Sequence, residues 1–173
     1  IRNCVFIGCS SNNGEGNAIS ISKTQPRMRI KEDGDDDDMN AIEDNIFRDC
    51  GNGSGYVIEV DDEDQISLIR NNTIEFTKPE KACGAIRIVK FGNITIDNCT
   101  FIKGSIYYNH ESQTQTSNFV TINNCNFKSC IGYACYFNVK ELSAEEINIQ
   151  YSKFYSNEAA IYIKNNKIIN IIN

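Results

Sequence analysis

A short motif centred on phenylalanine recurs along almost the whole chain and constrains the fold more than any other feature. Each copy has an isoleucine five residues before the central residue, which we call the anchor. The anchors are Phe6, Phe47, Ile74, Phe101, Phe127 and Phe154. Successive anchors are 41, 27, 27, 26 and 27 residues apart. A fixed repeat of this size is typical of solenoids, in which each unit buries its apolar side only against its neighbours.

Within each unit, apolar and polar residues alternate with the period of β-strands. The residue two before the isoleucine is again apolar in the clearest copies, as Ile94, Val120 and Ile147. Such alternation, rich in β-branched residues, predicts strands with one face turned inward. A further short apolar strand is expected after the loop that follows each anchor. These segments are 18–21, 57–60, 85–88, 134–137 and 160–163.

The alternation breaks three residues before each anchor, and we interpret this break as a bend. The residues at this position are Asn3, Asp44, Asn71, Asn98, Asn124 and Tyr151. Asn tolerates the left-handed backbone conformation and hydrogen-bonds nearby backbone with its amide. We therefore expect a bend at each of these positions, with the stacked Asn side chains sheltered in a ladder.

Three strands and their turns fill a unit of about 27 residues and leave no room for a helix. We therefore predict an all-β fold, a parallel β-helix of about six coils. Residues 1–173 form one domain, with an inserted acidic loop at 23–40 and a polar loop at 105–118. Leucine-rich repeats are a weaker alternative, because Leu occurs only at positions 68 and 142. The chain begins in the middle of a unit, so we expect both ends to be cuts within a longer array.

The eight cysteines have two interpretations. Several share positions in the repeat, and these are Cys4, Cys99 and Cys125 before the anchor and Cys9, Cys50 and Cys130 after it. They can be small buried hydrophobic residues in a ladder. Disulfides are the alternative, although directly stacked cysteines have parallel Cβ vectors. A zinc site is disfavoured, because the sequence lacks paired CxxC motifs and its single histidine, His110, lies in a polar stretch.

Acidic residues gather in two runs within a chain of net charge −6. Each run follows the corresponding strand of neighbouring coils, so we expect both at the same edge of the solenoid. Carboxylates collected in this way are candidate Ca²⁺ ligands, and these are Asp35, Asp36, Asp37, Asp38, Asp61, Asp62 and Glu63. The alternative is a solvated acidic loop without a metal. The acidic charge also argues against nucleic acid as a partner, and the sequence suggests no other cofactor.

One pair of elements resembles a known family. Phe154-Tyr155-Ser156-Asn157 followed by Ala159-Ala160-Ile161, and partly Cys83-Gly84-Ala85-Ile86, resembles the repeats of polymorphic membrane proteins, which are bacterial autotransporter adhesins. The chain also resembles the wider pectin-lyase-like superfamily, which shares the coil architecture and an Asn ladder. The resemblance implies a right-handed β-helix that is displayed on a surface and used for adhesion.

Three functional classes follow from these patterns. The first is a non-enzymatic rod, cell-surface or secreted, that binds a carbohydrate or another host-surface ligand. The second is a carbohydrate-active enzyme of the lyase or hydrolase type, with Asp61, Asp62, Glu63, Arg87 and Lys90 as candidate groups. The third is an intracellular structural scaffold, in which the cysteines are reduced. We favour the rod over the enzyme, because the candidate acids lie mostly in a loop, whereas a catalytic carboxylate pair needs rigid strands.

The expected partners are flanking coils of the same chain, or further copies through self-association at the cut ends. No apolar run is long enough to cross a membrane, so no membrane span is expected in this segment. If the protein is secreted by a eukaryote, we expect glycans at Asn52 or Asn93, which lie in turns, before Asn71 or Asn98, which occupy the bend.

Overall fold

The computed structural model describes residues 1–11, 17–22, 41–51, 55–61, 66–78, 82–89, 93–109, 119–139, 146–164 and 168–172. Within these ranges the chain forms strands and turns and no helix, which confirms the all-β prediction. The same ranges therefore contain no helix that could cross a membrane. The predicted acidic loop at 23–40 lies outside the described residues.

The eighteen strands form three parallel sheets of six strands each. The anchor sheet consists of β1 (Val5–Ile7), β4 (Ile46–Arg48), β7 (Thr73–Glu75), β10 (Thr100–Ile102), β13 (Asn126–Lys128) and β16 (Lys153–Tyr155). The isoleucine sheet consists of β3 (Ala41–Glu43), β6 (Leu68–Arg70), β9 (Ile94–Asp97), β12 (Phe119–Asn123), β15 (Glu146–Gln150) and β18 (Ile168–Ile172). The tyrosine sheet consists of β2 (Ile19–Ser22), β5 (Tyr56–Asp61), β8 (Gly84–Ile88), β11 (Ile106–Asn109), β14 (Tyr133–Asn138) and β17 (Ala159–Lys164).

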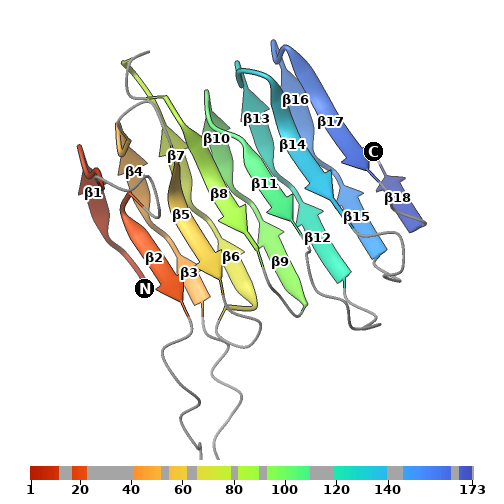
Figure 1. Cartoon of the computed structure of the whole chain (residues 1–173), viewed down its shortest axis with the longest axis horizontal. Coiled ribbons are helices and arrows are strands. Elements are labelled where there is room, and N and C mark those ends of the chain that lie inside the picture. Colours follow the sequence, from red (N-terminus) through yellow and green to blue (C-terminus); the bar gives the residue numbers. More distant parts are fainter. Residues whose placement is uncertain are drawn as a thin grey trace, which may run out of the picture.

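The chain visits the anchor, tyrosine and isoleucine sheets in turn and then begins the next unit, so the fold is a β-solenoid. Each strand pairs in parallel with the matching strand of the neighbouring unit. In Figure 1 the tyrosine sheet lies in front, and the other two sheets lie behind it. The sequence runs from β1 at one end of the stack to β18 at the other. The predicted parallel solenoid is confirmed at this level.

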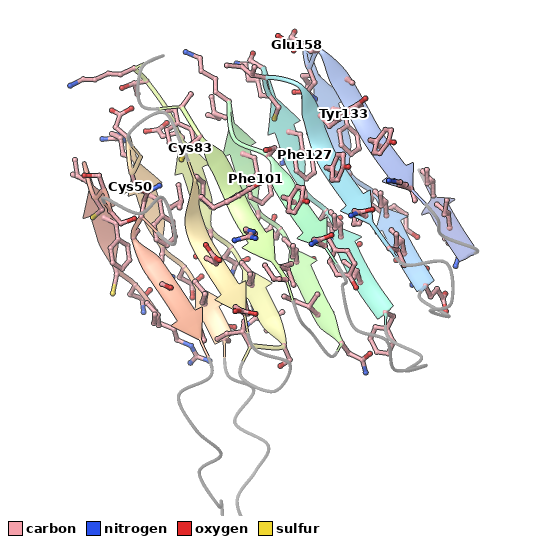
Figure 2. All side chains as sticks on the ribbon, in the orientation of Figure 1. Cys50, Cys83, Phe101, Phe127, Tyr133 and Glu158 are labelled. Atoms are coloured by element: carbon pink, nitrogen blue, oxygen red, sulfur yellow. The ribbon has the colours of Figure 1, made fainter. Side chains whose placement is uncertain are left out.

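The core is built from columns of like residues. Phe127 is fully buried, and its ring stacks on Phe101 at 4.8 Å and on Phe154 at 4.9 Å between ring centroids. Figure 2 labels Phe101 and Phe127 on neighbouring strands. The isoleucines five residues before the anchors form a second column in register, as Ile42, Ile69, Ile96, Ile122 and Ile149. The inward face that the alternation predicted for these strands is therefore confirmed.

The predicted bends are confirmed, but the prediction that the Asn side chains at the bends are sheltered from solvent is wrong. All six bend residues have positive φ, between 48° and 57°. Asn98 Nδ2 donates to Asn71 Oδ1 at 2.9 Å, and Asn71 Nδ2 donates to Asp44 Oδ1 at 2.9 Å. These side chains are exposed. A residue at a convex bend points away from the core, so the ladder of amides forms on the surface.

A second, buried pair of asparagines lies one residue further along the chain. Asn45 and Asn72 are each 1% exposed. Asn72 Oδ1 accepts hydrogen bonds from the backbone N–H of Asn45 and from Asn45 Nδ2, both at 3.0 Å. Asn72 Nδ2 donates to the carbonyl of Ile42 at 2.7 Å. Because a buried amide is costly unless it is hydrogen-bonded, this pair fixes the register of two coils.

Two further features differ from the prediction. The segment 105–118 is not a loop throughout, because Ile106–Asn109 form β11, and 110–118 lie outside the described residues. The sequence of β11, Ile-Tyr-Tyr-Asn, lacks the clean alternation of the other copies.

A second bend with positive φ, which we did not predict, follows most anchors by two residues. Its members are Gly8, Asp49, Lys103, Ser129 and Ser156.

Ion pairs between neighbouring coils occupy outward positions and help to fix the register in which the coils stack. Glu43 is 1% exposed and pairs with Arg2, and also with Arg70 Nη2 at 2.7 Å. Arg48 pairs with Glu75 on the outer side of the anchor sheet. Opposite charges directly across parallel strands are favourable, whereas a shifted register would place them beside other groups.

Candidate functional site

The outward face of the tyrosine sheet changes character along the stack. The residues at the middle outward position of successive strands are in register, and they are Ser20, Glu59, Arg87, Tyr107, Tyr136 and Tyr162. The first half of this column is polar or charged, and the second half is aromatic. Since the side chains of a strand alternate between its two faces, these rings lie outside the core.

The three tyrosines of the column stack on one another. Tyr107 and Tyr136 have ring centroids 5.0 Å apart with 7° between their planes. The rings of Tyr136 and Tyr162 are 4.9 Å apart with 14° between their planes. These distances match the spacing of about 4.8 Å between neighbouring strands. The sheet itself therefore holds the rings in place.

Two more tyrosines extend the aromatic surface, which we call the tyrosine stripe (Tyr56, Tyr107, Tyr133, Tyr136 and Tyr162). Tyr133, labelled on β14 in Figure 2, is 40% exposed and packs at 4.9 Å against Tyr162 with a tilt of 44°. Tyr56 lies 5.8 Å from Tyr107, two strands away. Burial raises the pKa of Tyr56 to about 12.

The position of Tyr56 depends on Gly84, which lies beside it on β8. A Cβ at Gly84 would come within 2.1 Å of two carbon atoms of the Tyr56 ring. No real contact is that short, so the ring can cross β8 toward Tyr107 only because residue 84 has no side chain.

A second outward column runs beside the rings, two residues further along each strand. It contains Asn109 on β11, Asn138 on β14 and Lys164 on β17, in register. Asn138 Nδ2 donates to Asn109 Oδ1 at 2.8 Å. Asn109 is buried, Asn138 half-buried and Lys164 exposed. The outer face therefore carries an amide or amine next to each stacked ring.

The charged part of the face includes Arg87, which the sequence suggested as an enzymatic group. Arg87 Nη1 donates to Glu59 Oε1 at 2.7 Å, and Glu59 is only 7% exposed. The guanidinium is therefore paired with a carboxylate that the sequence did not suggest as a site residue.

Most of the predicted metal ligands lie outside the described residues, namely Asp35, Asp36, Asp37, Asp38, Asp62 and Glu63. Asp61 ends β5 and is half-buried, in register with Ser22. Lys90, the remaining enzyme candidate, is also outside the described part. Within that part, no group of three or more His, Cys, Asp or Glu side chains is placed to hold a metal ion. Ca²⁺ binding by the acidic runs stays a prediction.

The two predicted glycosylation sites also stay predictions. Asn52 is outside the described residues, and Asn93 is exposed, with its Oδ1 accepting a hydrogen bond from the N–H of Phe119 at 3.1 Å. We expected the bend to shelter Asn71 and Asn98 from glycosylation, and this is wrong because both side chains are exposed. Their amide nitrogens are instead engaged in the surface ladder.

All eight cysteines are free thiols in the structure. Five are buried, and these are Cys50, Cys99, Cys125, Cys130 and Cys135. Burial raises the pKa of Cys83 to about 12 and the pKa of Cys50 and Cys130 to about 11. Cys125 shares a hydrogen bond with Cys99, which together with burial raises the Cys125 pKa. These environments match the interpretation of cysteine as a small core residue.

A hollow of about 510 Å³ lies at the β18 end of the stack. Its walls include Ile149, Phe154, Ile161 and Ile171. Ile171 continues the isoleucine column but is 61% exposed. The hollow is therefore the uncovered end of the core rather than a cleft in its side.

The sequence patterns identified two of the five stripe residues as members of strands, Tyr136 and Tyr162, without indicating that they stack. Tyr107 was missed because its strand was assigned to a polar loop. Aligning the repeat units on the strand that follows the loop after each anchor, by its middle outward residue, would have placed Tyr107 in the column. Tyr56 and Tyr133 lie at the starts of their strands, and the alignment carries no signal for them.

Fold and outer face together define a β-solenoid with an aromatic stripe on one sheet. Comparisons of the chain with protein-family models, with curated proteins and with solved structures gave no match. The resemblance to polymorphic membrane proteins and to the pectin-lyase-like superfamily thus stays a hypothesis.

Proposed function

We propose that this chain is part of a non-enzymatic β-helical rod, displayed on a cell surface or secreted, which binds a ligand on the tyrosine sheet. The tyrosine stripe carries the proposal. Tyr and Arg contribute much of the energy at binding surfaces. Rings that already stack on a rigid sheet lose little conformational entropy when a ligand arrives. Adhesion to a host surface is the role that suits such a rod.

The aromatic part of the face suits binding better than catalysis. Hydrolysis of a glycosidic bond commonly requires two carboxyl groups at a defined separation on rigid elements. Strands β11, β14 and β17 contain no Asp or Glu. Rings, amides and one amine can recognise a ligand, but they supply no acid–base pair near neutral pH.

We further propose that the solenoid is right-handed, comprises six coils and continues into flanking coils of the same chain or a second copy. Crossover connections between parallel strands are right-handed in nearly all cases. Exposed apolar residues on the inward side of β18 support the continuation, since Ile169 is 42% and Ile171 61% exposed. A further coil stacked on β18 would cover them and extend the isoleucine column.

Adherence assays with the purified protein test the binding function. The triple variant Y107A/Y136A/Y162A removes the stacked rings, and Tyr155→Ala is the matched control, because Tyr155 is an exposed tyrosine on the anchor sheet. We expect beads coated with the parent or with Y155A to adhere to cultured epithelial cells, and beads with the triple variant to lose most adherence. Circular dichroism must show that the triple variant keeps its β-structure. Equal adherence of triple variant and parent would contradict the proposal.

A further inference from the structure

The outer surface of the tyrosine sheet repeats its chemistry at every strand from β11 to β17. Each of these strands presents a phenol and, two residues on, an amide or amine. The rings recur at 5.0 and 4.9 Å. A ligand that lies along the solenoid axis meets the same groups at each step. Such a surface matches a ligand that is itself a repeating polymer better than one with an irregular surface.

Stacking decides which part of each ring a ligand can reach. The faces of Tyr107, Tyr136 and Tyr162 are turned toward one another, which leaves ring edges and hydroxyl groups outward. Each phenol can donate and accept a hydrogen bond. Tyr133 is different, because it is tilted and 40% exposed, so it offers apolar ring surface beside the row of hydroxyls. Rows of hydroxyls beside apolar surface are complementary to sugars, which combine hydroxyl groups with C–H faces.

The charge of the face selects among polymers. Arg87 is paired with Glu59, and the remaining described cation beside the stripe is Lys164. The whole chain has net charge −6, which repels a polyanion. Phenols and amides carry no charge near neutral pH.

On the basis of the binding function proposed above, we infer that the ligand of the tyrosine stripe is an extended neutral glycan lying along the solenoid axis. The hydroxyls of Tyr107, Tyr136 and Tyr162 hydrogen-bond successive sugar units. Tyr133 packs against the apolar face of one sugar, and Asn138 and Lys164 contact hydroxyls at the side of the chain.

The competing ligand is a protein, because tyrosine is also enriched at protein interfaces. The hydroxyl groups separate the two classes. A protein partner that packs mainly on ring surface tolerates Tyr→Phe, whereas a site built on hydroxyl hydrogen bonds loses affinity when they are removed. Tyr→Phe also keeps the stacked rings and therefore the sheet.

The decisive experiment compares the parent with Y107F/Y136F/Y162F, using Tyr155→Phe as the matched control. The probes are hexasaccharides of β-1,4-linked glucose and of β-1,4-linked N-acetylglucosamine, with polygalacturonate as the anionic polymer. Tyrosine fluorescence reports binding directly, because the chain has eight Tyr and no Trp. We expect a neutral hexasaccharide to bind the parent and Y155F equally, and the triple Phe variant to lose at least about tenfold in affinity.

Cell adherence after periodate oxidation of surface glycans separates this inference from the proposed function. Adherence that is lost both with periodate and with the triple Phe variant supports both. Adherence that survives periodate and the Phe variant, yet is lost in the Ala variant, overturns the glycan and leaves a protein ligand on the same stripe. Tighter binding of polygalacturonate than of either neutral probe, or equal affinities of parent and Phe variant, also overturns the glycan. Adherence unaffected by the Ala variant refutes the binding function itself.

Discussion

Truncation of Phe127 is the most direct test of the stacked core. Phe127 is fully buried, with a ring neighbour on each side at 4.8 and 4.9 Å. Replacing it with alanine removes buried ring surface, leaves a cavity between two other rings and breaks both stacking contacts. Phe→Ala in a packed core costs about 3–5 kcal/mol. That is a large part of the total stability of a typical protein, about 5–15 kcal/mol.

For a chain of this length, about 4 kcal/mol corresponds to a melting temperature lower by about 8–16 °C. Thermal unfolding followed by circular dichroism measures this shift. Lys128→Ala is the matched control, because Lys128 is the next residue. The loop expected after the anchor Phe127 would include Lys128, but Lys128 ends β13 with its side chain exposed. We expect K128A to melt within about 2 °C of the parent.

Phe154→Ala provides a graded comparison. Phe154 is half-buried, and among described residues its ring stacks only on Phe127. We therefore expect a smaller loss than for F127A. Equal melting temperatures of F127A and the parent would refute the stacked column as a source of stability. Helical circular dichroism of the parent would refute the solenoid.

Three further predictions concern the stripe and the thiols. Gly84→Ala should lower the melting temperature and displace Tyr56, whereas the double variant with Gly84→Ala and Tyr56→Ala should recover part of the lost stability. Thermal unfolding measures both variants, and an unchanged melting temperature of G84A would contradict the 2.1 Å clash. The free energy of unfolding, measured in urea, should fall as pH rises from 9 toward 10, by up to about 1.4 kcal/mol per pH unit for each of Cys50 and Cys130. Folding raises the pKa of these two thiols from 9.0 to about 11, so the unfolded chain loses their protons at a lower pH than the folded chain. Cys130→Ala should reduce that slope, and a flat profile in the parent would show that these thiols titrate alike in both states. Alkylation in denaturant without reductant should label all eight cysteines by mass, and labelling only after reduction would reveal disulfides instead of free thiols.

The thiol experiment must be done on unfolded protein. Burial alone protects residues such as Cys99, Cys125 and Cys135 in the folded state. Protection of native cysteines from alkylation therefore cannot distinguish disulfides from packed thiols, and it says nothing about the compartment in which the protein functions.

The sequence alone determined the repeat, the strand type and the bends. The reason is visible in single residues: the core positions of Ile42 and Phe47 and the bend at Asp44 each follow from the residue's own side chain and from the local period of two. A column of isoleucines or phenylalanines follows directly once copies of one motif stack in register. These features are local in origin, and repetition makes them visible.

Only the tertiary structure decided which outward residues meet. Tyr56 and Tyr107 are 51 positions apart in the chain and lie on strands that are not neighbours, yet their rings approach because Gly84 leaves room between them. Asn45 and Asn72 bond inside the core, while the bend asparagines bond outside it, and the sequence pattern gave no sign of that difference. Outward positions are not constrained by a common core, so their residue types vary from copy to copy, and stacking of the coils determines which of them form a surface.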